Sequence, residues 1–138
     1  MKLLIIHHRQ YSNLFSQPVQ SGLGHFYQVF CEHHIALYEC HIKDLGPRYS
    51  IRGFQGIIIM GARESVNNSR SWMGYEAAII QQALEHQVPI LGICFGAQHI
   101  AKILGGQVLS TESGHIGVFE LSKMQSCSLL EKVANTFY

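Results

Sequence analysis

Short, unbroken apolar runs recur along the chain and predict buried strands. They cover residues 3–6, 35–40, 56–60 and 89–93, and residues 56–60 read GIIIM. Unbroken runs of this length are typical of strands that are buried on both faces of a parallel sheet. Polar segments rich in Gly, Ser and Asn follow several of these runs and indicate loops, notably over residues 12–24, 43–50 and 61–70.

Helical patterns lie between the strands. One covers residues 25–32, and a second begins at Ser71, which we expect to cap it, and ends near residue 86. Its apolar stripe consists of Trp72, Tyr75, Ile79 and Ala83. A third helix covers residues 97–104. In that helix the spacing of the apolar residues predicts a stripe that packs on the sheet, formed by Ala97, Ile100, Ala101 and Leu104.

The alternation of strands and helices predicts right-handed βαβ units and therefore a mainly parallel, three-layer α/β sandwich. Two further strands are predicted over residues 107–109 and 116–121, and residues 129–138 are expected to form a short helix or a loop. We expect residues 1–138 to form one domain, because this length suits one and no internal repeat is visible.

Composition narrows the classes of function. The chain is 47% hydrophobic and 14% charged, which supports a packed core, and its net charge of +1 predicts no nucleic-acid or membrane partner. No apolar run approaches a membrane span, and no signal-peptide pattern opens the sequence. We therefore expect a cytoplasmic chain whose four cysteines are reduced thiols.

Residues 92–96, Gly-Ile-Cys-Phe-Gly, lie between a predicted strand and a predicted helix. G-x-C-x-G in this context is the thiol form of the nucleophile elbow, a tight turn that carries Cys94 to the carboxyl edge of the sheet. There the amino terminus of the helix stabilises a thiolate and an oxyanion. We expect the N–H of Phe95 to be one oxyanion donor and the loop at Gly61-Ala62 to supply the other. The alternative is that Cys94 is a small buried apolar residue.

Gln98 and His99 follow Cys94 on the predicted helix. Gln98 lies about one turn after Cys94, which predicts that it reaches the same site. His99 is rotated by about 100° further and is predicted to point away from Cys94. His7 and His8 follow the first strand at the functional edge, where they either line the pocket or belong to a loop without function. None of the nine histidines is placed by the sequence as the base of Cys94.

Residues 89–108, PILGICFGAQHIAKILGGQV, resemble the nucleophile block of class I glutamine amidotransferases. Residues 54–68 resemble the oxyanion strand and loop of that family, residues 21–26 the first-helix entry of its stand-alone, guanylate-synthase-like branch, and residues 112–121 a block that usually reads Glu-Ile-Gly. The resemblance implies a flavodoxin-like sheet and hydrolysis of glutamine through a glutamyl thioester. It implies that Cys94 is the nucleophile, that Phe95 with Gly61 or Ala62 binds the oxyanion, and that Gln98 contacts the glutamine.

The sequence departs from the family in three ways. Ala62 stands where a second Gly is usual, and His115 stands where the family has Glu. The catalytic His and Glu of the family lie in a C-terminal His-x-Glu motif, and no His-x-Glu occurs in the 138 residues. We therefore expect a domain that lacks its C-terminal strands, self-associates and has no glutaminase activity alone. The alternative is a truncated product or pseudoenzyme that acts at most as a binding module.

Other functions are less well supported. A zinc site is suggested by five residues whose spacing fits no standard ligand pattern: Cys31, His33, His34, Cys40 and His41. Cys31 and Cys40 are expected at opposite edges of the sheet, about 17 Å apart, so we expect no metal and no cofactor. A thiol hydrolase of the α/β-hydrolase type is one alternative, but its elbow normally follows more strands than the three predicted before Pro89. The intracellular-protease and chaperone superfamily is another alternative. It often has His directly after its cysteine, where this chain has Phe95, and Gln is not expected there at the position of Gln98.

Overall fold

The computed structural model describes residues 1–8, 25–111, 117–122, 131, 136 and 137. The chain divides into two compact units, Met1–Val108 and Leu109–Tyr138. Among the described residues, the first unit contains a four-stranded sheet with three α-helices, and the second contains one short strand pair. Over the described residues no helix combines the length and the apolar character needed to cross a membrane.

The sheet of the first unit is parallel, with the strand order β2-β1-β3-β4. Its strands are β1 (Lys2–His7), β2 (Ala36–His41), β3 (Gly56–Ile59) and β4 (Ile90–Gly92). The chain adds β2 on one side of β1 and β3 on the other. The order therefore reverses at β1, and ligand sites of such sheets lie at the carboxyl ends of the strands near this point.

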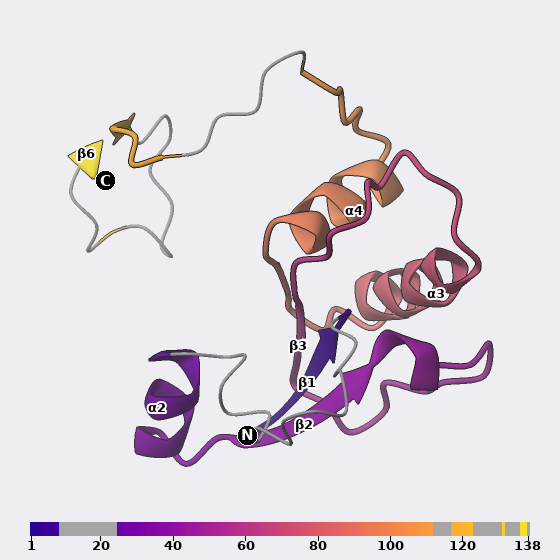
Figure 1. The fold of residues 1–138 in the computed structure, drawn as a ribbon. Helices are drawn as coiled ribbons and strands as arrows, with labels where there is room; N and C mark the ends of the chain where they lie inside the picture. Colours follow the sequence, from indigo (N-terminus) through magenta and orange to yellow (C-terminus); the bar gives the residue numbers. More distant parts are fainter. Residues whose placement is uncertain (9–24, 112–116, 123–130, 132–135, 138) are drawn as a thin grey trace, which may run out of the picture. The chain divides into compact units, whose positions relative to one another are not determined.

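The sheet is the middle layer of three. Helices α3 (Ser71–Glu85) and α4 (Phe95–Ile103) lie on one face, and α2 (His25–Glu32) lies on the other (Figure 1). Alternate residues of β1 face the two layers, since Leu4 and Ile6 pack with α3 while Leu3 and Ile5 pack with aromatic residues of α2. The predicted flavodoxin-like α/β sandwich is confirmed.

The central strands are apolar on both sides, as their sequences predict. The side chains of Leu4, Ile6 and Ile59 are completely buried, and those of Ile5 and Ile57 are nearly so. Strand β4 lies at the end of the sheet, and its Leu91 is 43% exposed. The predicted strands and helices of this unit agree with the observed ones to within one or two residues.

Several predictions about local structure are wrong. Ser71 is the first residue of α3 instead of its cap, a position held by Arg70 without a side-chain hydrogen bond. Residues 107–109 form no strand, because Gly105 and Gly106 end α4 in turns and the chain then continues without a ladder partner in the described part.

The second unit also differs from the prediction where it is described. Strand β5 (Leu121–Ser122) pairs with β6 (Thr136–Phe137) in antiparallel register. Within the described residues 117–121 of the predicted strand over 116–121, only Leu121 is in a strand. Residues 136–137 form a strand in place of a helix or loop. Positions 9–24, 112–116 and 123–130, with His115 and Cys127 among them, lie outside the described residues.

Candidate functional site

Cys94 occupies the turn between β4 and α4, at the carboxyl edge of the sheet. Its backbone has φ 53° and ψ −109°, an unusual conformation for a residue with a side chain. Such a conformation costs about 1–3 kcal/mol and is typical of nucleophile elbows, where the strained turn lifts the nucleophile away from the sheet. The residue is exposed, and its thiol is free. The predicted elbow is therefore formed, and the structure does not support a buried apolar role for Cys94.

Two glycines make the turn sterically feasible. A Cβ atom on Gly92 would lie 2.5 Å from the backbone nitrogen of Ala97, and one on Gly96 would lie 2.3 Å from the carbonyl oxygen of Ile59. Both contacts are with backbone atoms, which cannot move aside as a flexible side chain can. The glycines on either side of Cys94 therefore allow α4 to start directly against the end of β3.

The loop after β3 lies beside the thiol. A Cβ atom on Gly61 would lie 3.4 Å from Cβ of Cys94 and 4.0 Å from its Sγ. Ala62 packs against the buried cluster of Val66, Met73 and Phe95. The two segments predicted to supply oxyanion donors, residues 61–62 and the start of α4, therefore meet at Cys94.

Polar contacts tie this loop to the far end of α4. The ammonium group of Lys102 donates to the carbonyl oxygen of Val66 at 3.0 Å and to the side chain of Asn67 at 3.3 Å. Asn67 in turn donates to the carbonyl oxygen of Val108 at 2.8 Å. Glu64 forms an exposed ion pair with Arg70 at 3.1 Å. The loop is thus anchored at several points, and the backbone near Gly61 is held against α4.

Gln98 lies on α4 one turn after Cys94, as predicted. Its backbone N–H donates to the carbonyl oxygen of Cys94 at 3.1 Å, and the residue is exposed. It is therefore available to a ligand bound at the thiol. A hollow elsewhere in this unit is lined by Ile51, Arg52, Gly53, Phe54, His86 and Val88. These residues precede β3 and β4, so that hollow lies at the opposite end of the strands from Cys94.

The predicted buried face of α4 is confirmed only at Ile100, which is half-buried and packs on the core, and is wrong at the other three positions. Ala97 and Ala101 are exposed, and Leu104 is 63% exposed, whereas Phe95, Gly96 and His99 are buried. The reason is the contact of Gly96 with the end of β3 and a hydrogen bond of His99 to α3. Together these contacts turn the helix so that its histidine faces inward and most of its apolar stripe faces outward.

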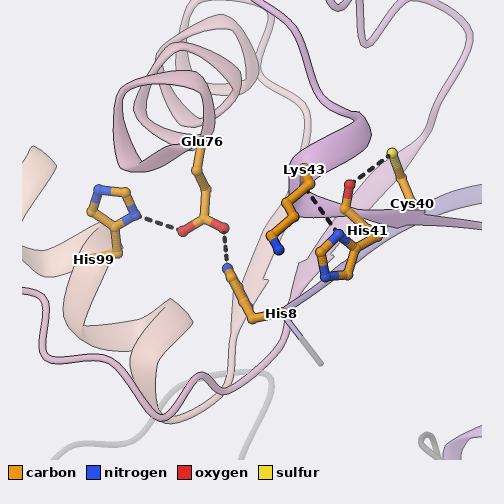
Figure 2. A network of polar contacts seen from close by, with 6 residues as sticks. All are labelled: His8, Cys40, His41, Lys43, Glu76 and His99. Atoms are coloured by element: carbon orange, nitrogen blue, oxygen red, sulfur yellow. Dashed lines mark hydrogen bonds and ion pairs between the residues drawn. The ribbon is translucent and has the colours of Figure 1, made fainter. Parts of the chain in front are cut away.

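A buried carboxylate joins three elements of the first unit. Glu76 of α3 is completely buried. One of its oxygens accepts from Nδ1 of His99 on α4 at 2.6 Å, and the other accepts from Nε2 of His8, just after β1, at 2.7 Å (Figure 2). The side chains of both histidines are also nearly inaccessible. We call this set of three residues the Glu76 network.

The two histidines determine the charge of Glu76. Burial by itself would raise the pKa of this carboxyl group. The hydrogen bonds from His8 and His99, and any positive charge on these rings, outweigh burial and hold the pKa below its ordinary value of 4.5. Glu76 is therefore an ionised carboxylate with both oxygens occupied.

Sequence reasoning missed this network. One signal was available: Glu76 lies four residues after Trp72 and three before Ile79, on the apolar stripe of α3, where a charged residue needs a buried partner. The sequence predicts His8 either in the pocket lining or in a loop without function. Its imidazole lies 5.0 Å from the indole of Trp72 and 5.2 Å from the ring of Phe95, measured between centroids, so it is part of the packed interior.

A second histidine cluster lies where β1 and β2 end. The rings of His7 and His41 are 5.2 Å apart, and Nδ1 of His41 accepts from the backbone N–H of Lys43 at 3.1 Å (Figure 2). Nearby, burial raises the pKa of the Cys40 thiol, and the Asp44 carboxylate raises it further. Within the described ranges no three His, Cys, Asp or Glu residues are grouped as metal ligands would be.

Comparison with known proteins extends this description. The profile of the family described as "Glutamine amidotransferase class-I" matches residues 11–138. The chain is 31% identical over 137 residues to the glutamine-hydrolyzing GMP synthase of Petrotoga mobilis, covering 99% of this chain and 23% of that protein. It is 37% identical over 94 residues to the GMP synthase of Azoarcus sp., and this match covers 67% of this chain and 16% of that protein. The chain thus spans less than a quarter of these relatives.

Solved structures with similar folds carry the same kind of description. A glutamine amidotransferase from Methylobacillus flagellatus is 29% identical with a TM-score of 0.68, and the match covers 84% of this chain and 43% of that one. One from Thermotoga maritima is 21% identical with a TM-score of 0.79, over 99% of this chain and 57% of that one, and shows the fold alone. The parallel sheet, the strained Cys94 elbow and the family profile over residues 11–138 agree, and the chain belongs to the class I glutamine amidotransferase family.

Proposed function

We propose that residues 1–138 are the nucleophile-bearing part of a glutamine amidotransferase domain that hydrolyses the side-chain amide of glutamine. The thiolate of Cys94 attacks the amide carbon, and the resulting oxyanion is bound by N–H groups of Phe95 and of residues 61–62. The carbon–nitrogen bond then breaks, ammonia leaves with a proton from a general acid, and a glutamyl thioester remains. Water releases glutamate and restores the thiol.

One observation carries this proposal: Cys94 is held at φ 53° beside Gly61, at the amino terminus of α4. A buried structural cysteine has no need of a strained turn, whereas an attacking thiolate needs exposure, a helix amino terminus and nearby backbone donors. Gln98, exposed one turn further on, is the candidate contact for the glutamine. Among the relatives, the GMP synthases carry glutamine hydrolysis in their names.

We further propose that residues 1–138 alone do not turn glutamine over. The departing ammonia needs a proton donor, and loss of general acid–base catalysis typically costs about 10²–10⁴-fold. The residues that act with a nucleophile act as a unit, so the loss is larger when the donor and its carboxylate partner are both missing. The sequence contains no His-x-Glu pair, and the described histidine–carboxylate network is buried at Glu76. The complementary segment would have to come from sequence outside these residues.

The second candidate is a non-catalytic binding module, which the missing His-x-Glu pair favours. A chloroketone analogue of L-glutamine separates the two. If Cys94 lies in a glutamine pocket, labelling of Cys94 saturates with the analogue and is blocked by L-glutamine. L-Asparagine, one methylene shorter, is the matched control and should protect weakly.

Mass spectrometry would locate the label, and ammonia release by the same protein would be measured against Cys94→Ala. Saturable, glutamine-protected labelling without ammonia release is the expected result. Labelling that rises linearly with the analogue and ignores glutamine would favour the binding module. Ammonia release above the Cys94→Ala background would show that a proton donor is already present.

A further inference from the structure

The phenyl ring of Phe95 is enclosed by aromatic side chains from three elements. It is 1% exposed. Its centroid lies 5.2 Å from that of His8, 5.4 Å from that of Trp72 and 5.5 Å from that of His99. Phe95 directly follows Cys94 and begins α4, so its ring and the backbone of the elbow belong to one short segment. Whatever fixes this ring also restrains the strained turn.

Two of the three enclosing rings are held by the same carboxylate. Glu76 accepts from Nε2 of His8 at 2.7 Å and from Nδ1 of His99 at 2.6 Å. Hydrogen bonds to an ionised, buried carboxylate are short and strong, and they fix the orientation of each imidazole. The Glu76 network therefore holds two of the rings that contact Phe95. It also connects α3, α4 and the end of β1 (Figure 2).

An amide at this position changes the hydrogen bonds of the network. Glutamine would offer one accepting oxygen and one donating nitrogen, so one histidine would have to accept a hydrogen bond. If His8 accepted through Nε2, the proton of the neutral ring would move to Nδ1. That atom is buried and has no hydrogen-bond partner within the described part of the chain. If His99 accepted through Nδ1 instead, both hydrogen bonds could form, but they would join neutral groups and be weaker than bonds to a carboxylate. The network is therefore weakened in either case when Glu76 becomes Gln.

We propose that Glu76 is a positioning residue for the nucleophile: through His8 and His99 it fixes the ring of Phe95 and so holds the backbone that presents the Cys94 thiolate and the Phe95 N–H. Its role in turnover rests on the proposed function, but its effect on the thiol does not require turnover. The competing explanation is that Glu76 contributes only to stability.

The test is the rate of alkylation of each cysteine by iodoacetamide at pH 7, with Cys31 of α2 as the internal reference. In Glu76→Gln the alkylation of Cys94, relative to that of Cys31, should be slower by about fivefold or more. The reason is that a displaced turn no longer presents the thiolate correctly. Loss of a nearby negative charge by itself would favour the thiolate and accelerate the reaction. The sign therefore separates positioning from a simple charge effect, and an unchanged or faster Cys94 overturns the proposal.

A matched pair at His99 removes the ambiguity of a general structural defect. In His99→Asn the side-chain nitrogen can still donate to Glu76, whereas His99→Leu cannot donate at all. Both variants lose the ring that contacts Phe95, but only His99→Asn keeps the hydrogen bond to Glu76. We therefore expect alkylation of Cys94 to slow less in His99→Asn than in His99→Leu. Partly buried Cys40 reports unfolding, because it labels as fast as Cys31 only when the core opens. Equal Cys94 rates in the two folded variants overturn the proposal.

If both Glu76→Gln and His99→Leu unfold while His99→Asn remains folded, the network is structural only, and the proposal is overturned as well. Failure of the proposed function looks different. In that case wild-type Cys94 reacts no faster than Cys31 and gains no protection from L-glutamine. The positioning role is judged only by the alkylation rate of Cys94 in each variant divided by its rate in the wild type.

Discussion

Helices α3 and α4 lie on the same face of the sheet but differ in how closely their backbones approach it. Helix α3 buries an ordinary apolar stripe that includes Ile79, Ile80 and Ala83. Helix α4 buries Gly96 against the backbone of β3 and His99 against a carboxylate, and it leaves Leu104 largely exposed. The first helix is placed by burial of side chains. The second also buries Phe95, but it approaches the backbone of β3 closely at Gly96, whereas Gly74 of α3 has no such neighbour.

This difference matters because hydrophobic packing tolerates small shifts, whereas a close backbone contact and a short hydrogen bond do not. The chemistry proposed for Cys94 needs positions accurate to a fraction of an ångström. The helix that follows the proposed nucleophile is thus the one with the closer backbone contact. Substitutions in the two helices should therefore have opposite patterns of effect.

The largest contrast is expected between a glycine of each helix. In Gly96→Ala the new Cβ would meet the carbonyl oxygen of Ile59 at 2.3 Å, which should cost about 3 kcal/mol or more of unfolding free energy. In Gly74→Ala on α3 nothing lies within 4 Å, so the better helix former should stabilise by about 0.5–1 kcal/mol. Urea unfolding monitored by circular dichroism measures both. Equal effects would show that the contact of α4 with β3 is not tight in solution.

The next contrast compares apolar residues of the two helices. Ile79 is 1% exposed, so Ile79→Ala should cost about 2–5 kcal/mol through lost burial and a cavity. Leu104 is 63% exposed, so Leu104→Ala should change stability by less than about 0.5 kcal/mol. A loss at Leu104 as large as that at Ile79 would mean that the apolar stripe of α4 is covered in solution, for example by self-association, which size-exclusion chromatography would detect.

The smallest contrast concerns acid. The pKa of Glu76 is lower in the folded protein than its ordinary value of 4.5, so its contribution to stability is present above that value and is lost as the pH falls through the folded pKa. Hydrogen bonds to a charged group contribute about 1.5–3 kcal/mol. The unfolding free energy of the wild type should exceed that of Glu76→Gln by about this amount at pH 7. The difference should become progressively smaller below pH 4.5.

The control for the acid experiment is Glu64→Gln. Glu64 forms an exposed ion pair with Arg70, and such pairs contribute little to stability. The difference between wild type and this variant should therefore stay small across the same pH range. A difference at Glu76 that is independent of pH would mean that the carboxyl group is not ionised when buried.

Much of the fold could be predicted because the strands carry their own signals. The apolar runs of β1 and β3 are long enough, and β-branched enough, to identify buried strands without tertiary information. The elbow could be predicted because the spacing of Gly92, Cys94 and Gly96 between a strand and a helix is typical of this tight turn. Strand signals failed over residues 107–109, where a short apolar stretch follows two glycines and has no ladder partner among the described residues.

The orientation of α4 could not be predicted from its own sequence. Spacing placed Ala97, Ala101 and Leu104 toward the sheet, but periodicity reports only which residues share a face. The buried face was decided by the carbonyl oxygen of Ile59 and by Glu76, residues separated from His99 by many positions in the chain. A buried charge and its partners are visible to sequence reasoning only as an anomaly, here a glutamate on the apolar stripe of α3.

The strained backbone at Cys94 also bears on how this sequence is expected to change under mutation. Glycine adopts φ 53° and ψ −109° without the penalty that a side chain incurs, and a single base change converts any cysteine codon to a glycine codon. A lineage with no use for the thiol would therefore gain folding stability from an easily reached substitution. Cysteine at this position is the costlier residue, and random drift in the absence of selection would be expected to remove it.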